Sequence, residues 1–197
     1  SLGNINSQID LTKRIDEYNA SVDCISCLTE EDHFLGTVHY LKEIREISPL
    51  PILRKDFMID EYQFYEAKVI GANAILLITG ILDDVQMKDF YQLTTELGLD
   101  ALFEAHTEEQ MDRALNCGAK IVGVNNRDLR DFTTKLDTTK RLSKMVPDDR
   151  ILVAESGIVS DEDVKYLKEC RVDAFLIGRA FMEAANPQEL AKHWKAL

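Results

Sequence analysis

Three charged residues close short apolar runs of the sequence, and their types suit proton transfer. Lys55 follows the run 51–54, Glu104 follows 101–103, and Glu155 follows 151–154. Because side chains alternate along a strand, each charge shares a side with the apolar residue two positions before it. A lysine beside carboxylates in a partly dry pocket can donate and accept protons. These residues predict general acid–base chemistry, and three solvated residues at strand ends are the alternative.

Two other strand ends are rich in small residues, and they indicate anion binding. One reads Glu155-Ser156-Gly157 and the other Ile177-Gly178-Arg179-Ala180. Glycine allows close approach of a ligand to the backbone, and N–H groups at the start of a helix bind phosphate. A phosphate site is therefore predicted here, with ordinary turn glycines as the alternative. Its predicted residues are Ser156, Gly157, Gly178 and Arg179.

The elements that must position these residues are seven short, apolar, β-rich runs, each followed by a helix signal. Helix starts are indicated at Asp10, Asp83-Asp84, Thr107 and Ser160, and Gly118 marks a helix end. With a helix before the first run and another over 187–197, the pattern predicts eight helices in strict alternation with seven strands. Such alternation is typical of a parallel sheet with helical crossovers. The predicted strands cover 23–28, 51–54, 74–78, 101–104, 120–124, 151–155 and 174–178.

Two α/β folds are compatible with this pattern. A doubly wound open sheet usually carries a glycine-rich fingerprint after its first strand, and the sequence has none there. A (β/α)8 barrel, the TIM barrel, needs eight strands, and here a helix precedes the first predicted strand. We therefore predict a single (β/α)8-barrel domain over residues 1–197, with the first strand and the N-terminal extension absent. In such barrels the site lies at the carboxyl ends of the strands, where the charged residues above are placed.

Composition narrows the class of partner. The net charge of −12 argues against nucleic acid and anionic membranes, and no apolar run reaches the length of about 18 residues that a membrane span needs. Without a signal-peptide pattern, we expect a cytoplasmic protein. Cys24 and Cys27 lie inside an apolar run with no second ligand pair, so reduced thiols are favoured over a metal site. The histidines also lack paired spacing, which favours core or surface roles for His33, His39, His106 and His193.

Longer motifs resemble those of the indole-3-glycerol-phosphate synthase family of tryptophan biosynthesis. The resemblance covers essentially the whole chain, and its most specific parts are Lys-Asp-Phe at 55–57 and Asn-Asn-Arg-Asp-Leu at 125–129. Leu28-Thr29 and His33-Phe34 are similar to the family's loop after strand two. The matching segments, in the family's order, are 51–60 with Gln63 and Glu66-Ala67, 71–78, 123–129 and 154–158.

The resemblance implies a carboxy-lyase that closes the indole ring of 1-(2-carboxyphenylamino)-1-deoxyribulose 5-phosphate, losing carbon dioxide and water, without a cofactor or metal. By resemblance, Lys55 protonates the substrate carbonyl oxygen as the ring closes. Glu104, partnered by Asn125, would act in the dehydration, and Glu155 would orient charge and a substrate hydroxyl. The anthranilate ring would contact Phe34, Leu76, Arg127 and Leu129, and the phosphate would contact Ser156, Gly157, Gly178 and Arg179.

The chain also departs from the family's pattern. Ser1-Leu2-Gly3 fits the last three positions of the family's Ser-Pro-Ser-Lys-Gly motif, with leucine in place of lysine. Arg179 stands where the family often has serine or glutamate. The family's first strand carries a catalytic glutamate and a lysine that no residue of this chain matches, so reduced activity is expected.

Two alternative functions remain open at this stage. A related phosphate-binding barrel isomerase, such as phosphoribosylanthranilate isomerase, usually has cysteine and aspartate at the ends of strands one and seven, whereas here the seventh ends in Glu155. A truncated, catalytically impaired barrel would only bind a phosphorylated ligand, or a partner along its exposed strand edges. We expect either a monomer or a chain fused to, or associated with, another tryptophan-pathway enzyme.

Overall fold

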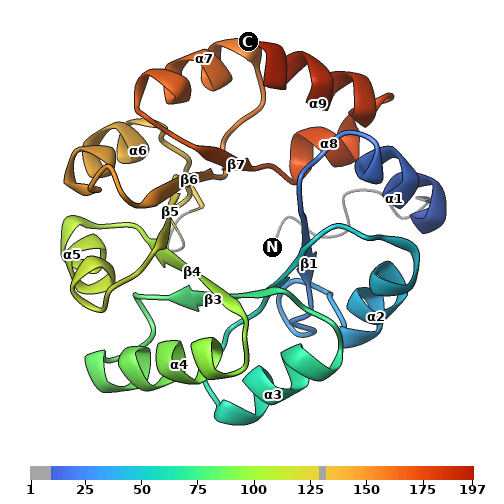
Figure 1. The fold of residues 1–197 in the computed structure, drawn as a ribbon. Helices are drawn as coiled ribbons and strands as arrows, with labels where there is room; N and C mark the ends of the chain where they lie inside the picture. The colour runs from blue at the N-terminus through green and yellow to red at the C-terminus, as the bar shows by residue number, and fades with distance from the viewer. Residues whose placement is uncertain (1–9, 129–131) are drawn as a thin grey trace. The chain divides into compact units, whose positions relative to one another are not determined.

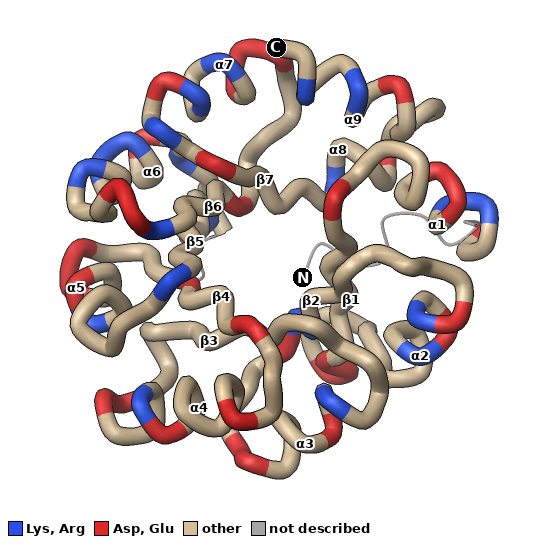
Figure 2. The backbone as a smooth tube through the Cα atoms, in the orientation of Figure 1, with Lys and Arg blue, Asp and Glu red and all other residues tan. Residues whose placement is uncertain are grey.

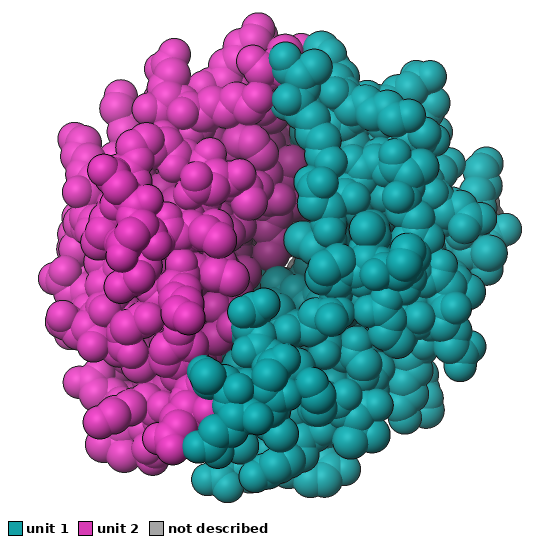
Figure 3. All heavy atoms as spheres, in the orientation of Figure 1, with its two compact units in different colours: residues 1–76, 93–100, 179–196 teal, residues 77–92, 101–178, 197 magenta. Residues whose placement is uncertain are grey.

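The structure is a computed structural model, and it describes residues 10–128 and 132–197. Leu129, predicted to contact the anthranilate ring, and the Ser1-Leu2-Gly3 motif lie outside the described residues. The chain divides into two compact units, coloured separately in Figure 3. Unit 1 comprises 1–76, 93–100 and 179–196, and unit 2 comprises 77–92, 101–178 and 197. The assignment of 1–197 to a single domain stays a prediction.

Unit 1 contains β1 (Ile25–Leu28), β2 (Ile52–Lys55) and the first three residues of β3 (Ala74–Ile78). These strands are parallel, with Ile25 opposite Ile52, Leu28 opposite Lys55, and Leu53 opposite Ala74. Three helices of this unit alternate with its strands, and two others come from the end of the chain. They are α1 (Leu11–Asn19), α2 (Val38–Ile47), α3 (Glu61–Val69), α8 (Arg179–Glu183) and α9 (Pro187–Ala196).

Unit 2 contains the end of β3 and four more strands, with α5, α6 and α7 together on one face of β4 to β7 (Figure 1). The register places Glu104 opposite Gly123, and Asn125 opposite Glu155. The helix α4 (Asp84–Glu96) begins in this unit and ends in unit 1. The other elements are β4 (Asp100–Ala105), α5 (Glu108–Asn116), β5 (Ile121–Asn125), α6 (Asp137–Leu142), the 3-10 helix η1 (Ser143–Met145), β6 (Ile151–Glu155), α7 (Asp161–Glu169) and β7 (Ala174–Leu176).

The predicted alternation of helices with parallel strands is confirmed, and the strand order is the chain order from β1 to β7. The predicted helix starts are also correct: Asp10, Thr107 and Ser160 each accept a backbone N–H of the first turn. Several details of the prediction are wrong, and most strand limits differ from the predicted ones by one or two residues. The last strand ends at Leu176 rather than Gly178, and the described residues contain an additional short helix, α8, which begins at Arg179. Gly178 therefore joins a strand to a helix.

Apolar side chains on the inner faces of the helices form the core of each unit, and charged residues of both signs are interspersed along the helices (Figure 2). In unit 1, Phe64 of α3 and Leu41 of α2 are completely buried. In unit 2, Met111 of α5 and Leu167 of α7 have the same role. Burial of these helix faces holds the strands, and therefore the strand ends, in place.

A buried charge cluster fixes the end of β2. Arg54 is 3% exposed, and its Nη2 lies 2.9 Å from Oδ2 of Asp56. Its Nη1 lies 2.8 Å from Oε2 of Glu66, and its Nε donates to the Thr29 hydroxyl at 3.0 Å. The Thr29 hydroxyl in turn donates to Asp56 Oδ2 at 2.6 Å. Because side chains alternate along a strand, anchoring Arg54 on one side of β2 directs Lys55 to the other side.

We predict that Arg54→Met lowers the free energy of unfolding by about 3 kcal/mol, because it leaves the Asp56 carboxylate buried without its cation. The matched control is Arg141→Met, which breaks an ion pair with Glu108 in which the side chains are 53% and 48% exposed. An exposed pair contributes less than about 1 kcal/mol. Urea unfolding of both variants measures the two losses, and equal losses would contradict the role assigned to Arg54.

Candidate active site

Glu104 and Asn125 form a buried pair at the carboxyl ends of β4 and β5. Glu104 is 2% exposed and Asn125 is 7% exposed. Nδ2 of Asn125 donates to Oε1 of Glu104 at 3.2 Å, and the backbone N–H of Arg127 donates to Oδ1 of Asn125 at 3.0 Å. The Arg127 bond orients the amide so that its NH2 group faces the carboxylate. Two residues predicted from the sequence to act together are thus in direct contact.

Glu155 ends β6 beside this pair and is 1% exposed. Its strand neighbour is Asn125, and its carboxylate lies against Gly123, two residues earlier in β5. A Cβ added at Gly123 would overlap Oε1 of Glu155, so glycine at this position leaves the room that the carboxylate occupies. On the other side of β5, Gly123 is paired with Glu104 of β4. The structure therefore gathers Glu104, Asn125 and Glu155 at the ends of three adjacent strands.

His106 belongs to the same group, although the sequence interpretation favoured a core or surface role for it. Its Nε2 lies 3.7 Å from Oε1 of Glu104, and its backbone N–H donates to Oε1 of Gln110 at 2.8 Å. Among the described residues, Nε2 is buried and makes no hydrogen bond. The signal that could have revealed His106 is its spacing: it follows Glu104 by two residues, which places both side chains on one side of the chain.

Lys55 ends β2 in unit 1, half-buried, opposite Leu28 of β1. Its carbonyl oxygen accepts the backbone N–H of Thr29 at 3.2 Å, which extends the ladder between β1 and β2 by one bond. Lys55 belongs to unit 1 and the carboxylates to unit 2, so the clustering of Lys55 with Glu104 and Glu155 stays a prediction.

An aromatic pair follows β1 and β2. The rings of Phe34 and Phe57 lie 5.5 Å apart, and His33 meets Phe57 edge-on at 6.1 Å. Phe34 was predicted to contact the substrate ring, whereas Phe57 was not singled out, even though it follows Lys55 by two residues. Leu76 of β3, also predicted to contact the ring, is 2% exposed. The aromatic pair offers an apolar surface suited to a planar ring.

Glu30 shapes the loop that carries Phe34. Its carboxylate accepts backbone N–H bonds from Asp32, His33 and Phe34 at 2.8–3.0 Å, and its Oε1 lies 2.9 Å from Nδ1 of His33. Burial raises the pKa of the Glu30 carboxyl, but hydrogen bonds from the His33 ring and from these backbone groups outweigh burial and lower the pKa from 4.5 to about 2. The ionised carboxylate therefore holds the loop at neutral pH.

The turn after β6 has an unusual backbone conformation. Ser156 and Gly157 have consecutive positive φ angles of 66° and 79°. In some turns, neighbouring backbone N–H groups point into a shared concavity, which favours anions. Gly178 is exposed, with open space around it, whereas Arg179 pairs with Glu183 at 2.8 Å and is 56% exposed. The phosphate contacts of all four residues stay predictions.

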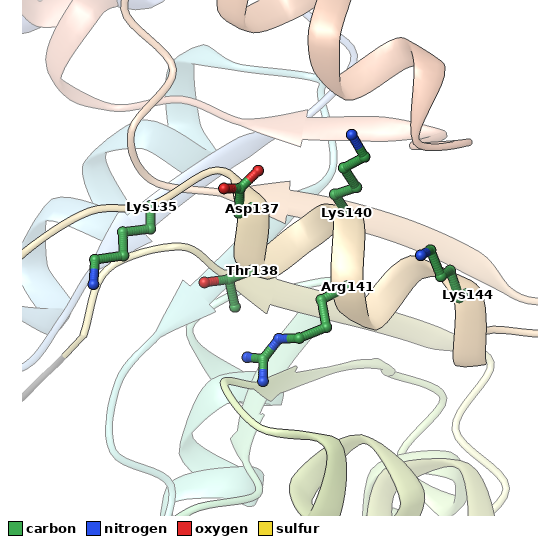
Figure 4. Close-up of a pocket in the computed structure, with 6 residues that line it drawn as sticks. All are labelled: Lys135, Asp137, Thr138, Lys140, Arg141 and Lys144. Atoms are coloured by element: carbon green, nitrogen blue, oxygen red, sulfur yellow. The ribbon is translucent and has the colours of Figure 1, made fainter.

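Other candidate sites are weaker. Among residues 10–128 and 132–197, no group of three His, Cys, Asp or Glu side chains is placed to hold a metal, and no helix is long and apolar enough to cross a membrane. A shallow pocket on α6 is basic (Figure 4), but Arg141 already bonds Glu108 and Lys140 lies 5.4 Å over the Tyr166 ring. The pocket lining comprises Lys135, Asp137, Thr138, Lys140, Arg141 and Lys144.

Parallel strands in chain order, alternating with helices and with buried carboxylates at their carboxyl ends, define the class of (β/α)8-barrel enzymes. A thiamine phosphate pyrophosphorylase from Pyrococcus furiosus shares this fold: its TM-score is 0.72 at 12% identity, over 96% of this chain and 89% of that one. The fold class predicted from the sequence is confirmed.

The family follows from closer relatives. Residues 1–194 match the family described as Indole-3-glycerol phosphate synthase. The chain is 54% identical to the indole-3-glycerol phosphate synthase of Lachnospira eligens, over 99% of this chain and 75% of that protein. It is 48% identical to that of Acetivibrio thermocellus, over 100% of this chain and 76% of the relative. The chain belongs to the indole-3-glycerol phosphate synthase family, and this makes it a carboxy-lyase of tryptophan biosynthesis that acts on a phosphorylated substrate.

We predict that Gly123→Ala lowers turnover at least tenfold, about 1.4 kcal/mol in the activation barrier, because the new methyl group displaces the Glu155 carboxylate. Overpacking a buried site typically costs about 1–3 kcal/mol, so the free energy of unfolding should fall by no more than about 3 kcal/mol. Steady-state kinetics measure the change in turnover, and urea unfolding measures the change in the free energy of unfolding. Unchanged turnover would mean that the position of Glu155 does not matter to the reaction.

We also predict that Glu30→Gln destabilises the protein at neutral pH and progressively less in acid. A carboxyl whose folded pKa lies below its unfolded value contributes stability above the unfolded pKa, and that contribution is lost as pH falls through about 2. Urea unfolding of parent and variant from about pH 7 to about pH 3 measures the difference. A difference that stays constant over this range would contradict the hydrogen-bonded state described for Glu30.

Proposed function

We propose that Lys55, Glu104, Asn125 and Glu155 carry out the ring closure of 1-(2-carboxyphenylamino)-1-deoxyribulose 5-phosphate to indole-3-glycerol phosphate. The reaction releases carbon dioxide and water and requires that a carbonyl oxygen be protonated and later leave as water. It therefore needs proton donors and acceptors rather than a redox group. The observation that carries the proposal is the buried Glu104–Asn125 pair, with Glu155 on the adjacent strand.

Glu104 is the group proposed to act in the dehydration. A carboxyl group enclosed by protein is poised to exchange protons with a bound substrate, because water does not compete for it. Asn125 donates to one oxygen of this carboxyl and so fixes its orientation. Glu155, equally buried, is proposed to orient charge and a hydroxyl of the substrate.

Lys55 is proposed as the general acid that protonates the carbonyl oxygen during ring closure. The Arg54 cluster on the opposite side of β2 fixes the backbone at Lys55. A fixed backbone helps a flexible side chain to place its ammonium group at one position in each catalytic cycle. The anthranilate ring is proposed to pack on Phe34 and Phe57, with contributions from Leu76, Arg127 and Leu129.

The phosphate is proposed to bind through backbone N–H groups at Ser156 and Gly157, and at Gly178 and Arg179 after β7. Positive φ angles at the first pair, and the start of a helix at Arg179, support this assignment. The ion pair of Arg179 with Glu183 favours a backbone role over a side-chain role for Arg179. A cytoplasmic location, and a monomer or an association with another pathway enzyme, stay predictions.

Membership of the family favours the synthase over the isomerase alternative, and the remaining alternative is a barrel that only binds ligand. An assay that follows the fluorescence of the newly formed indole separates them. The protein should turn over the substrate in this assay. Binding without turnover would support the ligand-binding alternative and overturn the proposed reaction.

Lys55→Ala is predicted to reduce kcat by about 100-fold or more, the usual contribution of a positioned general acid, while the protein stays folded. The matched control is Lys144→Ala, since Lys144 lies on η1, away from the strand ends. Kinetics on the indole fluorescence and far-UV circular dichroism provide the two readouts. A Lys55→Ala variant with a near-normal rate would place the general acid elsewhere.

A further inference from the structure

Asn126 is the residue after β5, is 2% exposed, and is the second asparagine of the Asn-Asn-Arg-Asp-Leu motif. The proposed function uses its neighbour Asn125 and leaves Asn126 without a role. Its Nδ2 donates to the carbonyl oxygens of Glu155 at 3.1 Å and Ser156 at 3.2 Å. Its Oδ1 accepts from the backbone N–H and the hydroxyl of Thr139, at 3.2 and 2.8 Å. All four hydrogen-bonding positions of the side-chain amide are therefore used.

The backbone of Asn126 reinforces the same contacts. Its N–H donates to the Glu155 carbonyl at 2.9 Å, and its own carbonyl accepts the N–H of Lys135 at 2.9 Å. One residue thus joins the end of β6 to the segment that leads into α6. An unsatisfied buried amide group costs about 1–3 kcal/mol. Because every hydrogen-bonding position of the Asn126 side chain has a partner, this side chain has a single preferred arrangement.

The two carbonyls that Asn126 Nδ2 holds belong to the peptide groups that contain the N–H of Ser156 and the N–H of Gly157. In a planar trans peptide the C=O and N–H groups point in opposite directions. Fixing the carbonyls of Glu155 and Ser156 toward Asn126 therefore turns the N–H groups of Ser156 and Gly157 away from it. These are the N–H groups proposed to bind phosphate.

The conformation held in this way is unfavourable for the isolated chain. A non-glycine residue at a φ of 66°, as at Ser156, costs about 1 kcal/mol or more and persists only when its surroundings impose it. Gly157, with a φ of 79°, packs so closely against Thr134 that an added Cβ would overlap the Thr134 methyl group. Thr134 lies in the segment that Asn126 anchors through Lys135. The turn is therefore supported from the side where Asn126 lies.

We propose that Asn126 is a positioning residue that preorganises the Ser156–Gly157 turn for a phosphate monoester and does not itself touch the substrate. The proposal rests on the phosphate site of the proposed function. Preorganisation lowers the conformational cost of binding, so its loss weakens binding of the phosphate more than it slows chemistry at Glu104. The expected signature is a raised KM with kcat largely retained.

The sharpest variant is Asn126→Asp, which keeps the shape and the acceptor for Thr139 but sets a carboxylate oxygen against the carbonyls of Glu155 and Ser156. KM for the substrate, and the inhibition constant of inorganic phosphate, should each rise about tenfold or more, with kcat within about threefold of the parent. Thr139→Val removes only the hydroxyl donor to Oδ1, so both constants should rise about two- to threefold. If Asn126→Asp does not fold, the KM and the phosphate inhibition constant of Thr139→Val test the role of Asn126.

Asp173→Ala is the matched control, because it removes a contact at the start of β6, whereas the Ser156–Gly157 turn follows the end of that strand. Oδ2 of Asp173 accepts the backbone N–H of Leu152 at 2.8 Å, near the start of β6. This variant should lower the melting temperature and leave KM and phosphate inhibition unchanged. An equal rise of KM in Asp173→Ala would mean that the effect is general destabilisation, and this would overturn the proposal. A folded Asn126→Asp variant with unchanged KM and an unchanged phosphate inhibition constant would also overturn it.

Calorimetric titration with inorganic phosphate separates this proposal from the proposed function. If the parent binds phosphate but does not turn over the substrate, the reaction assignment fails while the Asn126 variants still test the turn. If the parent turns over the substrate and the Asn126 and Thr139 variants bind phosphate as the parent does, the proposed reaction stands and the role of Asn126 is overturned.

Discussion

Parallel pairing of strands in chain order is the constraint on which the site depends. Each strand must be followed by a helix that returns the chain to the start of the next strand, so the carboxyl ends of neighbouring strands meet at one edge. In unit 2 this brings Glu104, Asn125 and Glu155 together from segments about 20 to 50 residues apart in the sequence. No local interaction of the chain could assemble this group.

The strand ends bury charge, and each buried charge is held in a defined way. At β2, the Arg54 cluster neutralises its own charges on one side of the strand and leaves the opposite side to Lys55. At β4 and β5, the Glu104 carboxylate receives an amide donor from Asn125 and has His106 3.7 Å away. The first arrangement serves stability, whereas the second brings together groups suited to exchange protons with a substrate.

Small residues and unusual backbone angles complete the site. Gly123 leaves room for the Glu155 carboxylate, and Gly157 leaves room for the Thr134 methyl group. The left-handed conformation of Ser156 is supported by Asn126 from the neighbouring strand end. The proposed acid–base group and the proposed phosphate turn thus share β6: Glu155 ends the strand, and the turn begins at the next residue.

The sequence by itself determined the alternation of strands and helices, the caps at Asp10, Thr107 and Ser160, and the family, because these depend on local periodicity and on motifs that are contiguous in the chain. It also singled out Glu104 and Asn125 as partners through that family. Only the tertiary structure decided that His106 faces Glu104, that Phe57 stacks near Phe34, and that Asn126 holds the turn after β6. The carboxyl end of β7 and the presence of α8 were likewise not predicted from the sequence. These features depend on contacts between residues far apart in the sequence, and register and side-chain direction fix such contacts only after the strands have paired.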